Sequence, residues 1–163
     1  MTATVCLRSG RAGDFTLEDA QGDTHHPARV LLATGVVDHL PELPGLRERW
    51  GRSVFHCPYC HGYELGRGAA IGVLATGPMS LHQAQLLPEW GAVTFLLNGA
   101  IELTAEQQAD LAARGVRIEA TPVRSLSDAA GSEGVTVHLQ DGRTLALAGV
   151  FTTPRTEPQG TLA

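Results

Sequence analysis

The 163-residue sequence contains no lysine, only three cysteines and no long apolar run. All twelve basic residues are arginines, a pattern that indicates codon-usage bias rather than a function. The net charge of −5 argues against nucleic acid as the main partner. Without a run of about 18 apolar residues, the sequence predicts no membrane span. Without a basic stretch followed by an apolar one after Met1, it predicts no signal peptide, so we expect a reducing, cytoplasmic location.

The remaining composition is typical of a soluble globular protein. Apolar residues make up 43% of the chain, and the mean hydropathy is −0.01. A chain of this length can bury roughly 70% of its unfolded surface in one ordinary core. The sequence therefore predicts at least one packed domain, and chemistry must be sought in local motifs.

Two of the three cysteines lie in the segment His56-Cys57-Pro58-Tyr59-Cys60-His61-Gly62. The Cys-x-x-Cys spacing brings two thiols close enough to form a disulfide. At a helix start, the free backbone amides and the helix dipole favour the thiolate form. Pro58 suits the first turn of such a helix, where a missing N–H costs nothing. We therefore interpret Cys57 and Cys60 as a redox pair.

Three other interpretations of the same segment stay open. His56, Cys57, Cys60 and His61 equal in number the four ligands of a zinc site, but adjacent residues rarely reach one metal, and Cys6 lies far away in sequence. Cys57-x-x-Cys60-His61 also matches the haem-attachment pattern literally, although no distal ligand is evident. The third alternative is a pair of cysteines without chemistry. We expect no metal.

The chain before the cysteines predicts strands separated by turns. Alternating apolar and polar residues predict strands over Thr4–Arg8 and Asp14–Glu18. The continuous apolar run Ala28–Ala33 predicts a strand buried on both faces, which ends at Thr34-Gly35. The proline-rich passage Leu40–Gly45 predicts a linker or a crossover between domains.

The chain after the cysteines alternates strands and helices in β-α-β-α-β order, which is typical of a doubly wound fold. Thr104 and Gln107 have the spacing of a helix capping box. We expect an α/β protein with a Rossmann-like three-layer nucleotide-binding domain, a parallel sheet and an added antiparallel β-meander. The predicted elements are strands at Ala69–Leu74, Val93–Leu97 and Val116–Ile118, helices at Met79–Trp90 and Thr104–Ala113, and further strands at Pro122–Leu126, Val135–Leu139 and Thr144–Phe151.

The turn after the strand at Ala69 carries a weakened dinucleotide fingerprint. The fingerprint G-x-G-x-x-G/A corresponds here to residues 75–80, ATGPMS, in which only the middle glycine, Gly77, is kept. The next strand ends in Leu-Asn-Gly, with neither an acid for a ribose hydroxyl nor arginines for a 2′-phosphate. Gly77, Pro78 and Met79 are the candidate nucleotide-binding residues, and a turn kept only for structure is the alternative.

The runs VLLATGVVDHLPELPGL, HCPYCHGYE and IGVLATGPMSLHQAQLL together resemble the low-molecular-weight thioredoxin reductases. Within them, the chain is most similar to the branch that includes flavin-dependent dithiol oxidases of the gliotoxin type. The resemblance implies that Cys60 exchanges electrons with FAD, and that Cys57 reacts with the substrate thiol or disulfide. It places Thr34 and Gly35 at a strand end that contacts FAD. His61 stands where the reductases carry an acid, and is a candidate general base for a substrate thiol.

The departures from the family pattern limit what the resemblance implies. The altered glycine turn puts NADPH-driven reduction in doubt and favours an oxidase that passes electrons from a dithiol through Cys57 and Cys60 to FAD and oxygen. The expected substrate is a thioredoxin-like protein or a small dithiol or disulfide. The alternative is a catalytically idle nucleotide-binding-like module that acts in binding or dimerisation, with zinc at the cysteine pair.

The resemblance also implies a domain division. Residues 1–42 match part of the flavin domain, residues 43–151 match the NADPH-binding-like domain that carries the cysteines, and residues 152–163 return toward the flavin domain. We expect a central fragment that does not hold FAD or turn over by itself. Its uncovered apolar surface predicts self-association, as a homodimer.

Overall fold

The computed structural model describes residues 5–130 and 134–159 of the chain. These residues form two compact units. The larger unit is His39–Arg155, and the smaller one combines the chain up to Asp38 with the chain from Thr156 onward. In the described residues, no helix has both the length and the apolar character that crossing a membrane requires.

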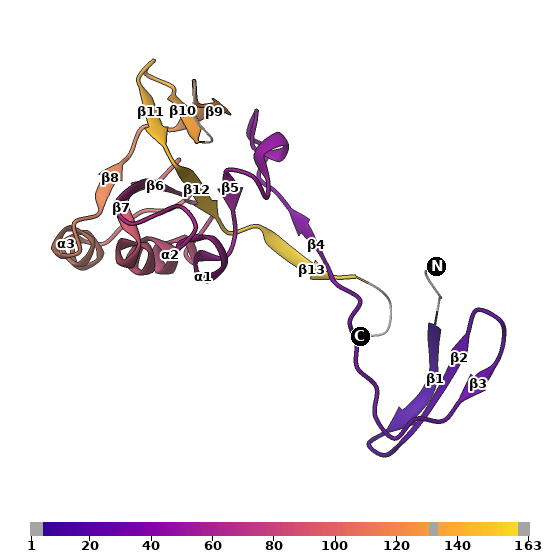
Figure 1. The fold of residues 1–163 in the computed structure, drawn as a ribbon. Helices are drawn as coiled ribbons and strands as arrows, with labels where there is room; N and C mark the ends of the chain where they lie inside the picture. Colours follow the sequence, from indigo (N-terminus) through magenta and orange to yellow (C-terminus); the bar gives the residue numbers. More distant parts are fainter. Residues whose placement is uncertain (1–4, 131–133, 160–163) are drawn as a thin grey trace. The chain divides into compact units, whose positions relative to one another are not determined.

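A five-stranded sheet forms the centre of the larger unit (Figure 1). Every pair of neighbouring strands in it is parallel. A parallel sheet needs a crossover between successive strands, which is why helices alternate with strands along the sequence. In spatial order the strands are β5 (Val54–Phe55), β12 (Gly149–Thr152), β6 (Ala69–Leu74), β7 (Gly91–Leu96) and β8 (Arg117–Glu119).

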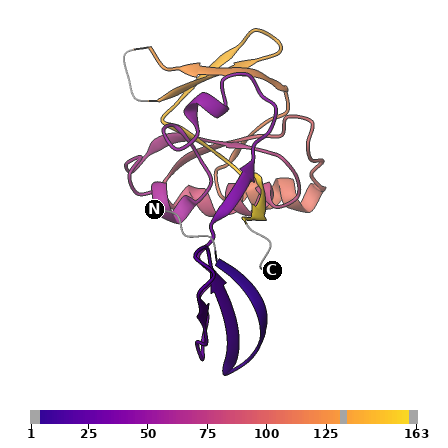
Figure 2. The same ribbon diagram turned by 90° about the vertical axis from the view of Figure 1, so that its right-hand side faces the viewer.

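The sheet is the middle of three layers (Figures 1 and 2). Helices cover one face, and an antiparallel three-stranded meander covers the other. The predicted α/β class, three layers, parallel sheet and meander are thus confirmed. The helices are α1 (Pro58–His61), α2 (Ser80–Leu86) and α3 (Ala105–Ala113), and the meander strands are β9 (Val123–Asp128), β10 (Val135–Leu139) and β11 (Thr144–Leu147).

Each face of the sheet has its own hydrophobic core. On the helix side, Ile71 and Val73 of β6 pack with Phe95 and Phe151. On the meander side, Leu74 packs with residues of β9 and β10. Successive side chains of a strand point to opposite faces, so a strand buried on both sides needs the continuous apolar run that β6 shows.

Helix α3 begins at the predicted capping box. The backbone N–H of Gln107 donates to the Thr104 hydroxyl at 3.3 Å, and the backbone N–H of Thr104 donates to Gln107 Oε1 at 2.9 Å. Both bonds satisfy helix-start donors that have no partner within the helix. Gly115, at φ +73, follows the helix end.

Two predicted elements are divided in the structure. The helix expected over Met79–Trp90 is α2 followed by a 3-10 turn, Leu87–Glu89, because Pro88 lacks the N–H that an α-helix needs there. The strand expected over Thr144–Phe151 is β11 of the meander and β12 of the central sheet. β12 starts at Gly149, which packs closely against Leu65: a Cβ on Gly149 would lie 3.0 Å from Leu65 Cδ1.

The smaller unit contains an antiparallel sheet of β1 (Val5–Arg11), β2 (Asp14–Asp19) and β3 (Thr24–His25). The predicted first two strands are present, and Thr4 lies outside the described residues. A separate two-stranded sheet pairs β4 (Val36–His39) with β13 (Arg155–Pro158).

The strand predicted over Ala28–Ala33 is wrong. These residues form no strand, and Leu31 is 90% exposed. An apolar run becomes a buried strand only when neighbouring strands pair with it and other elements cover its faces. The described residues provide neither for this segment.

The proline-rich passage Leu40–Gly45 lies inside the larger unit. The Pro44 carbonyl accepts a 2.9 Å hydrogen bond from the backbone N–H of Leu126 in β9. Leu46, directly after the passage, is completely buried. The passage is therefore packed against the meander, and the boundary between the two units falls at Asp38 and His39.

Candidate active site

Helix α1 carries both cysteines at its start. Cys57 is the N-cap residue, in an extended conformation with φ −90 and ψ 113, and Pro58 occupies the first turn. The backbone N–H of Cys60 donates to the Cys57 carbonyl at 3.2 Å. Both thiols are free; Cys57 is half-buried and Cys60 is exposed. The predicted helix start at the Cys-x-x-Cys segment is therefore present.

The two thiols interact, and their pKa values move apart. The hydrogen bond from the Cys60 thiol lowers the pKa of Cys57, and the backbone N–H groups of Cys60 and Tyr59 lower it further against the opposing effect of burial. The same hydrogen bond raises the pKa of Cys60, with burial and the charges of Cys57 and Glu64 acting in the same direction. As the pH rises, Cys57 therefore loses its proton before Cys60. The resulting thiolate is the form of cysteine that attacks disulfides.

His61 lies at the end of α1, next to Cys60. Its ring stacks on Phe55, with centroids 4.4 Å apart and planes at 19°. In the described part of the chain, its Nδ1 atom is buried and has no hydrogen-bond partner. The His61 residue as a whole is half-buried.

The zinc interpretation finds no support in the geometry. Among the described residues, no group of three or more His, Cys, Asp or Glu side chains is placed to hold a metal ion. His56 is exposed, and its backbone carbonyl is engaged by the Gln83 side chain.

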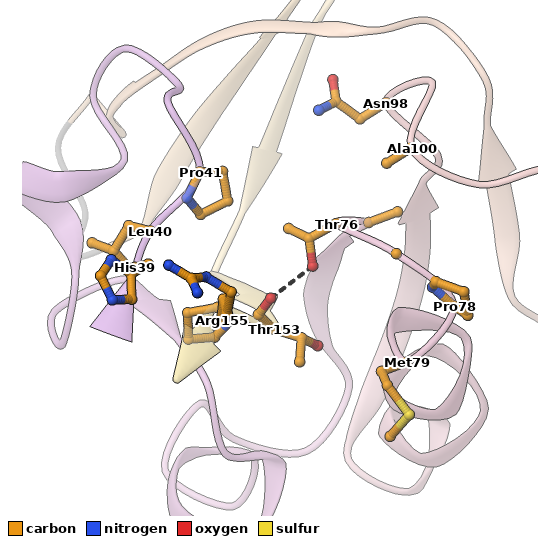
Figure 3. A pocket seen from close by; sticks show the side chains of 13 residues that line it. His39, Leu40, Pro41, Thr76, Pro78, Met79, Asn98, Ala100, Thr153 and Arg155 are labelled. Carbon is orange, nitrogen blue, oxygen red and sulfur yellow. Dashed lines mark hydrogen bonds between the residues drawn. The ribbon is translucent and has the colours of Figure 1, made fainter. Parts of the chain in front are cut away.

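A cavity of about 560 Å³ opens at the carboxyl ends of the central strands (Figure 3). The turn after β6 contributes Thr76, Gly77, Pro78 and Met79 to its wall. The predicted nucleotide-binding residues Gly77, Pro78 and Met79 therefore lie together at the edge of the sheet where doubly wound proteins bind their ligands. The rest of the lining comes from the end of β4 and from the segments that follow β4, β7 and β12: His39, Leu40, Pro41, Asn98, Ala100, Thr153, Pro154 and Arg155.

The turn after β6 has few donors to offer a phosphate group. The backbone N–H of Ala75 donates to Leu96 at 2.9 Å, and that of Thr76 donates to the Ser80 hydroxyl at 3.0 Å. Pro78 has no N–H. A Cβ on Gly77 would meet nothing within 4 Å, so the space before the turn is open. The cavity has room for a ligand, but its turn lacks the row of free amides that holds a pyrophosphate.

Thr34 and Gly35, the predicted FAD contacts, lie in the smaller unit. Both are exposed, and Gly35 has φ +74. The Gly35 carbonyl accepts a hydrogen bond from the Gln159 backbone N–H at 2.9 Å. The described residues of this unit do not enclose these two positions, so they form at most one edge of a flavin site.

Sequence reasoning missed a buried amide, Gln83 of α2. Its side chain is almost fully buried and donates from Nε2 to the His56 carbonyl at 2.7 Å. Its Oε1 accepts from the Thr153 hydroxyl at 3.1 Å. Figure 3 shows the next bond, in which the Thr153 carbonyl accepts from the Thr76 hydroxyl at 2.7 Å. The signal available in the sequence was an uncharged polar residue on the sheet-facing side of an amphipathic helix.

Two curated fungal proteins match most of the chain. It is 36% identical over 145 residues to "Thioredoxin reductase tcpT" of Claviceps purpurea, covering 85% of this chain and 45% of that protein. It is 30% identical over 174 residues to "Thioredoxin reductase sirT" of Leptosphaeria maculans, covering 99% of this chain and 53% of that protein. The chain is thus similar to thioredoxin reductase-like proteins over most of its length. It spans about half the length of these curated relatives.

Two solved structures show the same fold over most of this chain. An oxidoreductase from Agrobacterium tumefaciens has a TM-score of 0.73 and 51% identity, over 90% of this chain and 48% of that one. The protein HlmI has a TM-score of 0.77 and 36% identity, over 97% of this chain and 49% of that one. A comparison with models of protein families finds no match.

Proposed function

We propose that this chain is the dithiol-bearing part of a flavin-dependent thiol/disulfide oxidoreductase. Cys57 and Cys60 pass two electrons between a substrate dithiol or disulfide and FAD. The observation that carries the proposal is the interacting thiol pair at the start of α1, with the lowered pKa on Cys57. Shifted thiol pKa values are typical of reactive cysteines, so this difference favours a redox pair over a structural pair.

In the oxidative direction, a substrate thiolate attacks Cys57 Sγ of the Cys57–Cys60 disulfide. The disulfide breaks, a mixed disulfide forms, and Cys60 leaves with the electron pair. The second substrate thiolate then attacks the substrate sulfur of the mixed disulfide and releases Cys57. The substrate loses two electrons and becomes a disulfide, and the protein becomes a dithiol. The low pKa of Cys57 makes it the better leaving group in the second step.

His61 is the proposed base for this exchange. Its Nε2 accepts the proton of the entering substrate thiol, because only the thiolate is nucleophilic. The stack on Phe55 fixes the plane of the ring, so the proton acceptor has a defined position at the end of α1.

FAD, when bound, supplies the two-electron acceptor that reoxidises the pair, and oxygen is the proposed final acceptor. We propose that this chain alone does not hold FAD. The exposure of Thr34 and Gly35 supports this, as does the greater length of the relatives. NADPH is not part of the proposal, because the turn at Gly77 offers few free amides and the strand end after β7 offers no arginine.

The proposed substrate is a thioredoxin-like protein or a small dithiol or disulfide, in a reducing cytoplasm. Cys60 is exposed between Tyr59 and Tyr63, which are themselves mostly exposed, so a partner can reach the pair. Self-association as a homodimer is proposed from the exposed apolar side chains of Leu31 and Val36 in the smaller unit.

The first test is exchange between the oxidised chain and two reductants, dithiothreitol and reduced thioredoxin. Thiols released from the protein are counted by mass spectrometry after alkylation. The proposal predicts rapid reduction of one intramolecular disulfide, and no such reaction in Cys57→Ser. A wild-type chain that forms no Cys57–Cys60 disulfide under mild oxidation contradicts it.

The second test addresses FAD directly. The purified chain is incubated with excess FAD, desalted and examined by visible absorption before and after addition of dithiothreitol. The proposal predicts that no flavin band is retained. A retained band that bleaches with dithiol would show that this chain is a minimal flavoenzyme, and would contradict the proposed division of the site.

A further inference from the structure

We propose that Gln83 is a positioning residue that holds Cys57 in its reactive geometry through the backbone of His56. The proposal rests on the proposed redox role of the Cys57–Cys60 pair. It concerns how reactive Cys57 is, so it can be tested without FAD and without a substrate.

Little local structure holds Cys57 in place. The strand before it, β5, consists of Val54 and Phe55 only, and α1 after it is a single turn of four residues. His56 joins the two, and its side chain is exposed. A strand this short and a single helical turn are weakly stable by themselves, so contacts made by the residues around Cys57 must position it. One is the stack of His61 on Phe55, and another is made by the His56 backbone.

Gln83 makes the contact with the His56 backbone. Its Nε2 donates a 2.7 Å hydrogen bond to the carbonyl of His56, the residue directly before Cys57. Gln83 lies in α2 and is 6% exposed. The next residue of the helix, Ala84, belongs to the hydrophobic core on the helix side of the sheet. A hydrogen bond from a buried, packed side chain holds its acceptor more firmly than a bond in water, because breaking it leaves both groups unpaired away from solvent.

Thr153 sets the direction of the Gln83 amide. The Thr153 hydroxyl donates to Gln83 Oε1 at 3.1 Å, so the oxygen of the amide faces the end of β12 and its NH₂ group faces His56. The Thr153 carbonyl in turn accepts from the Thr76 hydroxyl at 2.7 Å. The end of β12 thereby orients the group that fixes the start of α1.

The expected consequence is a specific loss of Cys57 reactivity when the amide is removed. The pKa of Cys57 is lowered by the Cys60 thiol and by the backbone N–H groups of Cys60 and Tyr59. All three donors must stay aligned on the Cys57 sulfur. If the backbone at His56 moves, this alignment is lost, the pKa of Cys57 rises, and less thiolate is present at neutral pH.

The test measures iodoacetamide alkylation of Cys57 as a function of pH. All proteins carry Cys6→Ser and Cys60→Ser, so that Cys57 is the single thiol and a serine hydroxyl replaces the Cys60 thiol as donor in every variant. Gln83→Met removes both hydrogen bonds at similar volume. Gln83→Glu keeps the shape but presents carboxylate oxygens, which cannot donate to the His56 carbonyl. We expect both variants to alkylate at least about threefold more slowly at pH 7, with the pH profile displaced upward.

Gln85→Met is the matched control. Gln85 lies on the same helix, but its amide donates to Asp110 of α3 at 2.8 Å and not to the cysteine segment. It loses one side-chain hydrogen bond of the same helix, where Gln83→Met loses two, so its stability also falls but by less. Its alkylation profile should stay at the wild-type position, which separates a general loss of stability from a loss of positioning.

Thr153→Val keeps the proposal testable if the Gln83 variants fail to fold. It removes the hydroxyl that orients the amide and leaves Gln83 in place, so we expect a smaller slowing in the same direction. Wild-type alkylation profiles in folded Gln83→Met and Gln83→Glu overturn the proposal. If those variants do not fold, a wild-type profile in Thr153→Val overturns it. Failure of dithiol exchange with normal Cys57 alkylation would instead refute the proposed function alone.

Discussion

The imidazole of His61 and the phenyl ring of Phe55 are stacked, with their centroids 4.4 Å apart and their planes at 19°. Phe55 is the last residue of β5, and His61 is the last residue of α1. The contact therefore ties the end of the cysteine-bearing helix back to the strand from which it starts. His61 Nδ1 is buried and has no hydrogen-bond partner in the described part of the chain.

Replacing His61 by phenylalanine should separate the packing of this ring from its chemistry. His61→Phe keeps an aromatic ring over Phe55 and removes a buried, unpartnered nitrogen, so the free energy of unfolding should stay equal or rise by up to about 1 kcal/mol. Reduction of the Cys57–Cys60 disulfide by a dithiol at neutral pH should slow by about tenfold or more, because the proton acceptor is gone. Urea unfolding measures the free energy of unfolding, and rapid-mixing kinetics measure the rate of disulfide reduction. An unchanged exchange rate would remove His61 from the mechanism.

The two cysteines should react in an order that exposure alone does not predict. Cys60 is the more exposed thiol, yet the hydrogen bond between the thiols raises its pKa and lowers that of Cys57. At pH 7 the thiolate fraction decides the rate, so Cys60→Ser should be alkylated faster than Cys57→Ser, both in a Cys6→Ser background. Cys60→Ala, which lacks a donor, should be slower than Cys60→Ser. The reverse order of the two serine variants would mean that accessibility governs.

Gly45 should tolerate no side chain. It has φ +84, a conformation that L-residues adopt at a cost of roughly 1 to 2 kcal/mol. A Cβ there would also collide with the Leu126 carbonyl of β9. Gly45→Ala should therefore lower the free energy of unfolding by more than about 2 kcal/mol, measured by urea titration. Gly66→Ala is the matched control, because Gly66 has φ +87 and open space around it, and should cost only the conformational strain. Equal losses in the two variants would contradict the packing of the proline-rich passage on the meander.

The pair of Glu119 and Arg143 should make stability depend on pH in the acid range. The Arg143 guanidinium, at 2.8 Å, lowers the pKa of Glu119 from its ordinary 4.5 to about 2. A lowered carboxyl pKa contributes stability that is present above about pH 4.5 and is lost as the pH falls toward 2. Since Arg143 is more than half exposed, solvent screening keeps this contribution to stability small. Glu119→Gln and Arg143→Gln should each flatten the fall in unfolding free energy between about pH 5 and 3, relative to wild type. If the unfolding free energy of both variants falls as steeply with pH as that of the wild type, other carboxyl groups cause the fall.

Local signals in the sequence predicted much of the larger unit. The capping box at Thr104, the apolar run of β6 and the Cys-x-x-Cys helix start are written in consecutive residues, and each depends on contacts that form within a few residues or with directly neighbouring strands. The division of the expected strand Thr144–Phe151 was missed because nothing local marks where a chain leaves one sheet and enters another. The division follows from the partners: β11 pairs with β10 of the meander, and β12 pairs with β5 and β6 of the central sheet.

Contacts between distant residues were beyond local patterns. The run Ala28–Ala33 has the composition of a buried strand, but burial is a property of the partners, and the described residues supply none. The hydrogen bond from Gln83 to His56 joins residues 27 positions apart, and the bond from Thr153 to Gln83 joins residues 70 apart. The sequence indicated the reactive thiols, whereas the groups that hold them emerged only from the fold.

The most direct test of the central claim is a redox titration of the intact chain in glutathione buffers, with the Cys57–Cys60 disulfide quantified by alkylation and mass spectrometry. The account predicts a reversible intramolecular disulfide with a midpoint between about −120 and −270 mV, the range of catalytic dithiols. A pair that stays reduced throughout, or one whose midpoint lies below about −300 mV like that of a structural disulfide, would contradict a redox role for Cys57 and Cys60.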